Sequence, residues 1–280
     1  MCTTAIGAYA QKPMTIKDVQ DFQRMTTKQL SSDGKHVIAV TEPWRGDADR
    51  GGNMRTFVGD ATAKVYDAQG NILKTFCPVA NVAFTPGAKH VLVTTKMSEK
   101  EKEEAQQKKQ KDLPMDKLLI YTIGGETETI DSLKTYRISD KTDLLLYQRG
   151  KKDSTLYVRN FGKPEMTLAG VTSFQFAGDS KTLCFVSAGS GIDGTRGLFL
   201  LKEGQSTPVL VKEGDGSFRS ISFLKDSNTF VFIYTPKAAK DSKEKSKPEV
   251  WMSENGAPAK MILNSISGIA PEGYSISDAG

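Results

Sequence analysis

The stretch Leu30-Ser-Ser-Asp-Gly-Lys35-His-Val-Ile-Ala-Val40 decides the fold, because variants of it return four times along the chain. The later copies are Phe84–Val93, Tyr136–Tyr147, Phe174–Val186 and Ile221–Ile233. Measured at Lys35 and its equivalents Lys89, Asp143, Lys181 and Asn228, the copies are separated by 54, 54, 38 and 47 residues. Self-similarity at such a period is typical of repeat architectures.

Each copy combines an apolar-alternating stretch, a turn of Asp, Gly, Ser or Lys, and a second strand. Asp and Gly supply the side-chain hydrogen bonds and the positive φ that a tight reversal requires. A further hairpin follows each copy, at residues 63–73, 118–130, 156–168, 197–204 and 250–256. Four strands per repeat predict an all-β fold, a β-propeller of four-stranded blades. A β-sandwich would also have evenly spaced strands, but it has no reason to repeat one turn five times.

We expect blades at about 27–77, 79–130, 133–168, 171–210 and 217–263, and the start of a sixth at Tyr274-Ser-Ile-Ser-Asp278. The predicted partial propeller domain is therefore 27–280. Neighbouring blades bury each other's faces, so an unfinished sixth blade predicts an incomplete propeller, a fragment of a longer protein. The alternative is that residues 267–280 form a closing strand of a five-bladed ring.

The composition excludes several protein classes. The chain has 280 residues, a formal charge of +5, 38% hydrophobic and 25% charged residues, as in an ordinary globular protein. No apolar run approaches the roughly 18 residues of a membrane helix, so we expect no membrane span. Cys2, Cys77 and Cys184 are too few and too scattered for a disulfide framework or a four-ligand zinc site.

The N-terminus has features of an exported protein. Ala8-Tyr9-Ala10 has the small-x-small form cleaved by signal peptidase, so residues 1–10 are interpreted as a residual signal peptide. A disordered N-terminus is the alternative. Thr15 to Asp18 fits a capping box, and Ile16, Val19, Phe22 and Met25 have helical spacing, which predicts a helix at 15–25 within an N-terminal helical segment at 11–26. We expect a periplasmic or secreted protein.

Two charged segments interrupt the strand pattern. Ser98 to Lys117 carries six Lys and six acidic residues, and Glu104 lies four residues before Lys108, which predicts a solvated helix inserted between two strands of the second blade. Balanced charge without interleaved aromatic residues argues against nucleic-acid binding there. Lys237 to Lys247 has five Lys against two acids and is interpreted as a surface loop.

Three short motifs resemble ligand-binding sequences but lack the context or spacing that such binding requires. Gly189-Ser-Gly191-Ile-Asp-Gly194 matches the dinucleotide-binding turn, but the following residues have the pattern of a strand, so we interpret it as a hairpin loop. Arg45-Gly46-Asp47 matches an adhesive tripeptide that is common by chance. The nearby Asp47, Asp49 and Asp60 lack the spacing of a calcium loop.

The sequence offers no catalytic constellation. A serine hydrolase would need a G-x-S-x-G elbow, which is absent from the sequence. His36 and His90 occupy equivalent positions in two repeats, which indicates a role in the repeat, and Cys184 lies in an apolar strand as a small core residue. We therefore assign no catalytic, cofactor-binding or metal-binding residue, and expect no cofactor.

Several segments taken together resemble the N-terminal propeller of exported peptidases of the prolyl oligopeptidase family, including its dipeptidyl-peptidase-like and acylaminoacyl-peptidase-like members. They are Met14 to Phe22, Leu30 to Lys35, the Arg45-Gly-Asp47 loop and Asp112-Leu-Pro-Met-Asp-Lys-Leu-Leu-Ile120. The resemblance covers most of residues 14–280, although the blade repeat itself is shared with other periplasmic propellers.

The resemblance implies a gating propeller that caps a C-terminal α/β-hydrolase domain and restricts access to short peptides. It transfers no catalytic residue, because no position of this chain corresponds to the triad. The interpretation is a non-catalytic propeller of a serine peptidase. The alternative is a free-standing periplasmic propeller that binds a protein or a cell-wall component.

Overall fold

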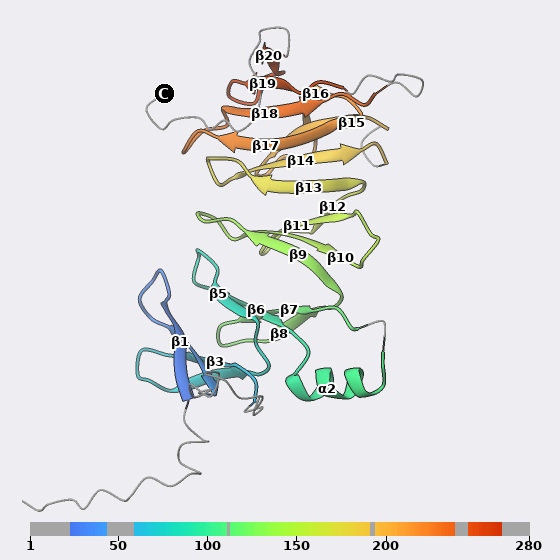
Figure 1. Ribbon diagram of the computed structural model, residues 1–280. Helices are drawn as coiled ribbons and strands as arrows, with labels where there is room; N and C mark the ends of the chain where they lie inside the picture. The colour runs from blue at the N-terminus through green and yellow to red at the C-terminus, as the bar shows by residue number, and fades with distance from the viewer. Residues whose placement is uncertain (1–22, 44–58, 111–112, 191–193, 239–245, 265–280) are drawn as a thin grey trace, which may run out of the picture. The chain divides into compact units, whose positions relative to one another are not determined.

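The computed structural model describes residues 23–43, 59–110, 113–190, 194–238 and 246–264. These residues form five antiparallel sheets of four strands, each in the order first, second, third, fourth strand, which confirms the predicted β-propeller blades (Figure 1). Such an order joins strands that are consecutive in the chain, and the first and last hairpins of each blade correspond to the two sequence signals of each copy.

The strands of each blade are as follows. The first blade has β1 (Gln23–Leu30), β2 (Val37–Pro43), β3 (Thr62–Tyr66) and β4 (Ile72–Phe76). The second has β5 (Asn81–Phe84), β6 (His90–Thr95), β7 (Lys117–Thr122) and β8 (Thr127–Ile130), and the third has β9 (Leu133–Ile138), β10 (Leu144–Arg149), β11 (Leu156–Asn160) and β12 (Met166–Leu168). The fourth has β13 (Val171–Phe176), β14 (Thr182–Ala188), β15 (Arg196–Lys202) and β16 (Val209–Glu213), and the fifth has β17 (Ser217–Phe223), β18 (Phe230–Thr235), β19 (Glu249–Ser253) and β20 (Lys260–Leu263).

The predicted helical insertion is confirmed as α2 (Glu99–Gln107), between β6 and β7. Ser98 caps it: the Glu101 amide donates to Ser98 Oγ at 3.2 Å, and the Ser98 amide donates to the Glu101 carboxylate at 2.8 Å. Lys108 Nζ lies 4.0 Å from the Glu104 carboxylate, as the four-residue spacing predicts.

The N-terminal helix prediction is wrong at its end. Residues 23–26 of the expected helical segment belong to β1, because Gln23, Arg24 and Met25 pair with Pro43, Glu42 and Thr41 of β2. Residues 1–22 lie outside the described residues, as do the Arg45-Gly-Asp47 loop and the sixth repeat at Tyr274–Asp278.

One hydrogen bond recurs in the first turn of every blade and explains the sequence repeat. The amide of the residue that begins the turn donates to the carbonyl five residues later. The pairs are Ser31 and His36, Thr85 and His90, Ser139 and Leu144, Ala177 and Thr182, and Leu224 and Thr229, at 2.8–3.0 Å. Because a six-residue turn of this kind closes each first hairpin, the copies share a preference for Asp, Gly, Ser, Thr and Lys in the turn.

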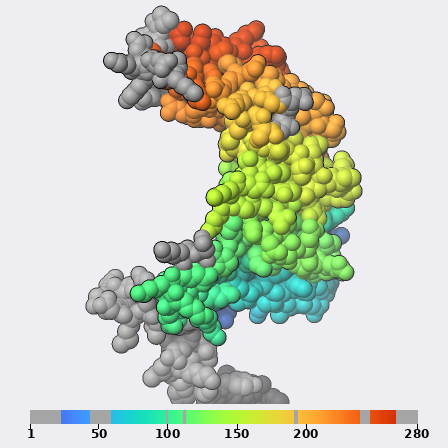
Figure 2. Space-filling model, turned by 90° about the vertical axis from the view of Figure 1, so that its right-hand side faces the viewer, coloured from blue at the N-terminus to red at the C-terminus, as the bar shows by residue number. Residues whose placement is uncertain are grey.

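The chain divides into two compact units. Unit 1 is Met1–Phe84, Val91–Pro114 and Leu118–Glu128, and unit 2 is Thr85–His90, Met115–Lys117 and Thr129–Gly280. Within unit 2 the third, fourth and fifth blades follow one another in chain order, from green through yellow to red (Figures 1 and 2). Unit 2 also holds the first turn of the second blade.

Each unit has a core made where neighbouring sheets face each other. In unit 1, Ile38 and Val65 of the first blade share a buried cluster with Val91 and Val93 of the second. In unit 2, one cluster joins the third and fourth blades and another joins the fourth and fifth. The inner strands are therefore buried on both faces, as in β10, where Leu144 to Gln148 are all buried.

A glutamine links neighbouring blades at two equivalent positions. The Gln29 side chain donates to the Val82 carbonyl at 3.2 Å, and the Gln175 side chain donates to the Ile221 carbonyl at 3.2 Å. Both glutamines lie two residues before the recurring turn, and both acceptors lie three residues before the turn of the next blade. The repeat thus positions contacts between blades as well as within them.

Candidate functional site

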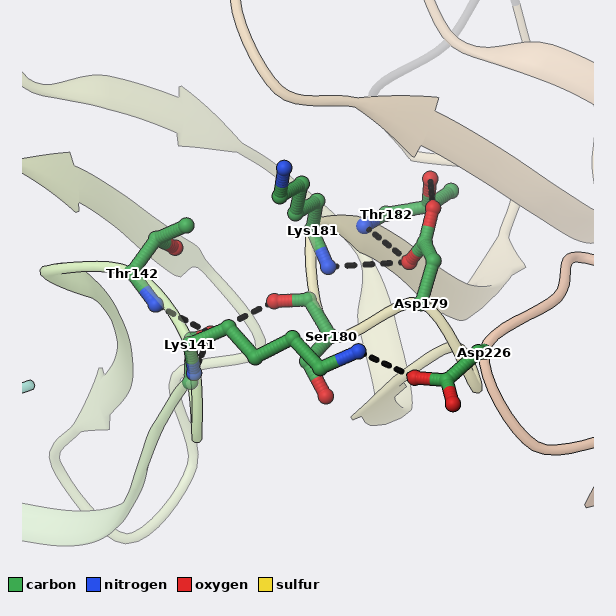
Figure 3. A network of polar contacts seen from close by, with 8 residues as sticks. Lys141, Thr142, Asp179, Ser180, Lys181, Thr182 and Asp226 are labelled. Carbon is green, nitrogen blue, oxygen red and sulfur yellow. Dashed lines mark hydrogen bonds and ion pairs between the residues drawn. The ribbon is translucent and has the colours of Figure 1, made fainter.

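The first turns of the third, fourth and fifth blades form a network of polar contacts in unit 2, which we call the turn clasp (Ser139–Leu144, Ala177–Thr182 and Leu224–Thr229). Ser139 Oγ donates to the Ser180 carbonyl at 2.5 Å, and the Asp226 amide donates to the Gly178 carbonyl at 3.0 Å. Figure 3 shows the Lys141 side chain extended along Ser180 to an ion pair with Asp226. The turn of the fourth blade is thereby held between its two neighbours.

Two carboxylates of the turn clasp, those of Asp179 and Asp226, accept hydrogen bonds within it. Asp179 accepts from the Lys181 amide at 2.8 Å and from the amide and hydroxyl of Thr182 at 2.8 and 2.7 Å (Figure 3). Burial raises the pKa of Asp179, but these hydrogen bonds outweigh burial and leave the pKa below its ordinary value. The hydrogen bond and charge of Lys141 lower the pKa of Asp226. Both groups are ionised near neutral pH and suit structural roles better than proton transfer.

The glycine-rich motif and the two histidines have structural roles in the part of the chain that the structure describes. Strand β15 begins at Arg196, two residues after Gly194, so a strand follows the glycine-rich segment as predicted. The described residues that flank this segment thus form strands, and a pyrophosphate site of this type needs a helix N-terminus. Residues 191–193 of that motif lie outside the described part of the chain. His36 and His90 both supply the carbonyl that closes the recurring turn, which confirms their equivalence.

The two described cysteines are free. Cys184 is buried in β14, as expected for a core residue, and burial raises the pKa of its thiol. Cys77 is exposed. Within the described residues, no group of three or more His, Cys, Asp or Glu side chains is placed to hold a metal ion.

His90 takes part in a ring stack that its sequence position did not predict. Its imidazole lies 4.0 Å from the Phe161 ring, centroid to centroid, with an angle of 19° between the planes. The Arg159 guanidinium lies 5.2 Å from the same phenyl centroid. Burial lowers the pKa of His90, the charges of Arg159 and Lys89 lower it further, and the Asp143 carboxylate opposes them.

We expect this stack to make folding sensitive to mild acid. The folded-state pKa of His90 is below its unfolded value of about 6.5. Stability from neutral His90 is therefore fully present above the unfolded pKa and is lost as pH falls through the folded pKa. Urea unfolding gives the free energy of unfolding at pH 7 and pH 5. The decrease between these two pH values should be smaller for His90→Phe than for the parent chain, because phenylalanine keeps the ring stack but does not titrate. Equal losses in the two proteins would contradict the assignment.

Unit 2 contains a groove of about 220 Å³ between the third and fourth blades. Its lining combines buried leucines with polar residues of two turns. The lining residues are Leu144, Val158, Asn160, Lys163, Pro164, Met166, Leu183, Leu201, Lys202, Glu203, Gly204, Gln205 and Ser206. A smaller pocket of about 70 Å³ lies in unit 1. Its lining residues are Thr26, Thr27, Val40, Glu42, Ala61, Val79, Ala80, Asn81 and Val82. The larger groove is the better candidate for a ligand, since it joins an apolar floor to convergent polar groups.

The first strands of the unit 2 sheets form exposed polar edges. On β9, Lys134, Thr135 and Arg137 are exposed, and on β17 Arg219 and Ser220 are exposed. The inner strands β10 and β18 are buried by contrast. A sheet edge of this kind faces water and carries side chains that can contact a polar ligand.

Sequence and structure comparisons give distant likenesses only. No protein-family model matches the chain, and no curated protein matches it in sequence. The β-propeller domain of the Trilobed protease from Pyrococcus furiosus is 10% identical with a TM-score of 0.42, over 88% of this chain and 72% of that one. Pyrococcus horikoshii acylaminoacyl peptidase is 11% identical with a TM-score of 0.37, over 89% of this chain and 41% of that one. TolB from Acinetobacter baumannii is 11% identical with a TM-score of 0.35, over 86% of this chain and 54% of that one.

These neighbours are β-propellers of peptidases and TolB-like propellers. Identities this low assign neither a family nor an activity to the chain. The chain spans less than half of the acylaminoacyl peptidase. No described helix has the length and apolar character needed to cross a membrane.

Proposed function

We propose that this chain is the non-catalytic gating propeller of an exported serine peptidase of the prolyl oligopeptidase family. In this proposal a C-terminal α/β-hydrolase domain supplies the Ser, Asp and His triad, and the full-length enzyme cleaves short peptides. The blades exclude folded proteins sterically. The chain itself carries no complete catalytic apparatus.

The observation that carries the proposal is the place of the charged insertion. Helix α2 lies between the second and third strands of the second blade, and β7 follows it at Lys117. This is the order in which Leu30–Lys35 and Asp112–Ile120 resemble the family in sequence. The exposed polar edge strands β9 and β17 also suit a water-filled passage for peptides, since propeller blades surround a central channel.

A free-standing periplasmic propeller that binds a protein or cell-wall partner is the second candidate. The groove between the third and fourth blades favours it, because a binding module needs a ligand site of its own. The native polypeptide in the source cells distinguishes the two candidates. An antibody against this segment should detect a species far larger than 30.6 kDa if the propeller belongs to a peptidase. A species near that mass supports the binding module.

We expect the isolated chain to show no labelling by a fluorophosphonate probe and no amidase activity. Such probes react with a serine that a neighbouring base has activated, and the sequence has no G-x-S-x-G elbow to present such a serine. The measurement is intact mass after incubation with the probe, beside a serine hydrolase as a positive control. Stoichiometric labelling of any serine in this chain would contradict a non-catalytic role.

A further inference from the structure

The groove between the third and fourth blades results from a short outer strand. β12 has three residues, Met166–Leu168, and pairs only with Leu156, Tyr157 and Val158 of β11. The end of β11 and the turn at 161–165 therefore lie beyond the reach of β12. The apolar part of the groove lining comes from both blades and includes Leu144, Val158, Met166, Leu183 and Leu201.

The groove has a rigid apolar floor and a small volume. Leu144, Leu183 and Leu201 are 1–5% exposed, so they are fixed by the core behind them. A volume of about 220 Å³ is below the roughly 300–1,000 Å³ of pockets for drug-sized molecules. The groove thus fits one apolar side chain and its backbone, and it is too small for a nucleotide or flavin.

The rim favours a negative charge on the ligand. Lys163, in the β11–β12 turn, and Lys202, at the end of β15, both line the groove. Neither has an ion-pair partner among the described residues. Glu203 is the one acidic residue in the lining of the groove. Its carboxylate accepts a hydrogen bond from the side-chain amide of Asn160 at 3.0 Å. The rim therefore has a net positive charge, because Lys163 and Lys202 are opposed only by Glu203, whose carboxylate already accepts a hydrogen bond.

We propose that this groove binds the C-terminal residue of a peptide, with an apolar side chain on the leucine floor and the α-carboxylate between Lys163 and Lys202. In such a residue the apolar group and the carboxylate are separated by two bonds, which matches lysines at the edge of an apolar floor. Charge-assisted hydrogen bonds from two ammonium groups hold a carboxylate at partly exposed sites. The site does not depend on the peptidase proposal, because it is argued only from the residues that line the groove, all of which belong to unit 2.

The probe is the tripeptide acetyl-Gly-Gly-Leu, compared with its C-terminal amide. Methyl-labelled Leu, Val and Met give nuclear magnetic resonance signals from the floor residues themselves. We expect the acid to shift the methyl signals of Leu201, Leu183 and Met166 selectively. The amide, which lacks the charge, should bind about threefold to tenfold more weakly, since each exposed ion pair contributes modestly.

Charge variants test the lysines. Lys163→Gln with Lys202→Gln should weaken binding of the acid to the level of the amide and leave binding of the amide unchanged. The matched control is Lys152→Gln with Lys247→Gln, which removes the same charge from exposed lysines in connections at the opposite end of the strands. Ser206→Phe, at the rim, should weaken both peptides while the protein keeps its melting temperature.

Two results would overturn the proposal. The first is the absence of floor-methyl shifts at 10 mM acid, a concentration about tenfold above a millimolar dissociation constant. The second is equal affinity for acid and amide in the parent chain, with no effect of the lysine substitutions. Selective shifts together with the predicted loss in the lysine variant support it.

Discussion

Replacing Phe232 with alanine should lower the free energy of unfolding of unit 2 by about 3–5 kcal/mol. Phe232 lies in β18 and is 0% exposed. It shares a buried cluster with Leu198 and Leu200 of the fourth blade, so its removal leaves a cavity between two sheets. The substitution also breaks ring contacts with Phe230 and Phe218, whose centroids lie 5.7 and 5.9 Å away.

Urea denaturation followed by circular dichroism measures this loss. Phe232→Leu is the conservative variant, and it should cost less because leucine fills most of the space. Met261→Ala is the surface control: Met261 is 46% exposed, and its loss should cost less than about 0.5 kcal/mol. A Phe232→Ala protein as stable as the Met261→Ala protein would show that the fourth and fifth blades do not share a core.

The blade boundaries could be predicted because the first and last hairpins of each blade leave a local signal in the sequence. The third and fifth blades were expected at 133–168 and 217–263, and their strands occupy those residues. The fourth runs to Glu213, three residues beyond the expected end. The reason is the recurring turn: its residues favour tight reversals, and such residues can be recognised without knowledge of distant contacts.

Contacts between blades could not be predicted in this way. The ion pair of Lys141 with Asp226 joins residues 85 positions apart, and the stack of His90 on Phe161 joins two turns of different blades. Sequence spacing carries no information on such pairs, because they depend on how neighbouring sheets pack. The error at the N-terminus has a similar cause: the helical spacing of Ile16 to Met25 is local, whereas pairing with β2 makes Gln23 to Met25 a strand.

The groove was missed for the same reason. Its floor combines Leu144 and Val158 with Leu183 and Leu201, which the sequence gives only as ordinary strand residues. Lys163 and Lys202 are unremarkable among the 38 Lys and Arg of the chain. The short strand β12 was the available signal, since the sequence from Phe161 to Glu165 contains Gly and Pro and predicts a wide turn.

A second substitution with a large expected effect on stability lies in the turn clasp, at Gly178. Gly178→Ala should lower the free energy of unfolding of unit 2 by about 3 kcal/mol, because the new methyl group has no room. A Cβ at this position would lie well inside contact distance of the Leu224 carbonyl oxygen and 2.8 Å from the Ser227 carbonyl oxygen. Both are backbone atoms of the next turn, held by the hydrogen bond from the Asp226 amide to the Gly178 carbonyl. They cannot move without separating the turns.

Gly87→Ala is the matched control for this prediction. Gly87 lies in the equivalent turn of the second blade, and a Cβ there would meet the Asp143 side chain, with Cγ at 2.9 Å. A carboxylate at the end of a rotatable side chain can turn aside, but Asp143 then loses the hydrogen bond that its carboxylate accepts from the Gly87 amide at 2.7 Å. This substitution should therefore cost about 1 kcal/mol, the typical value of one hydrogen bond. Urea denaturation gives both values, and hydrogen exchange at Asp226 should accelerate in Gly178→Ala alone. Equal destabilisation by the two substitutions would mean that the fifth-blade turn yields as easily as a side chain, and the turn clasp would then contribute little to the rigidity of unit 2.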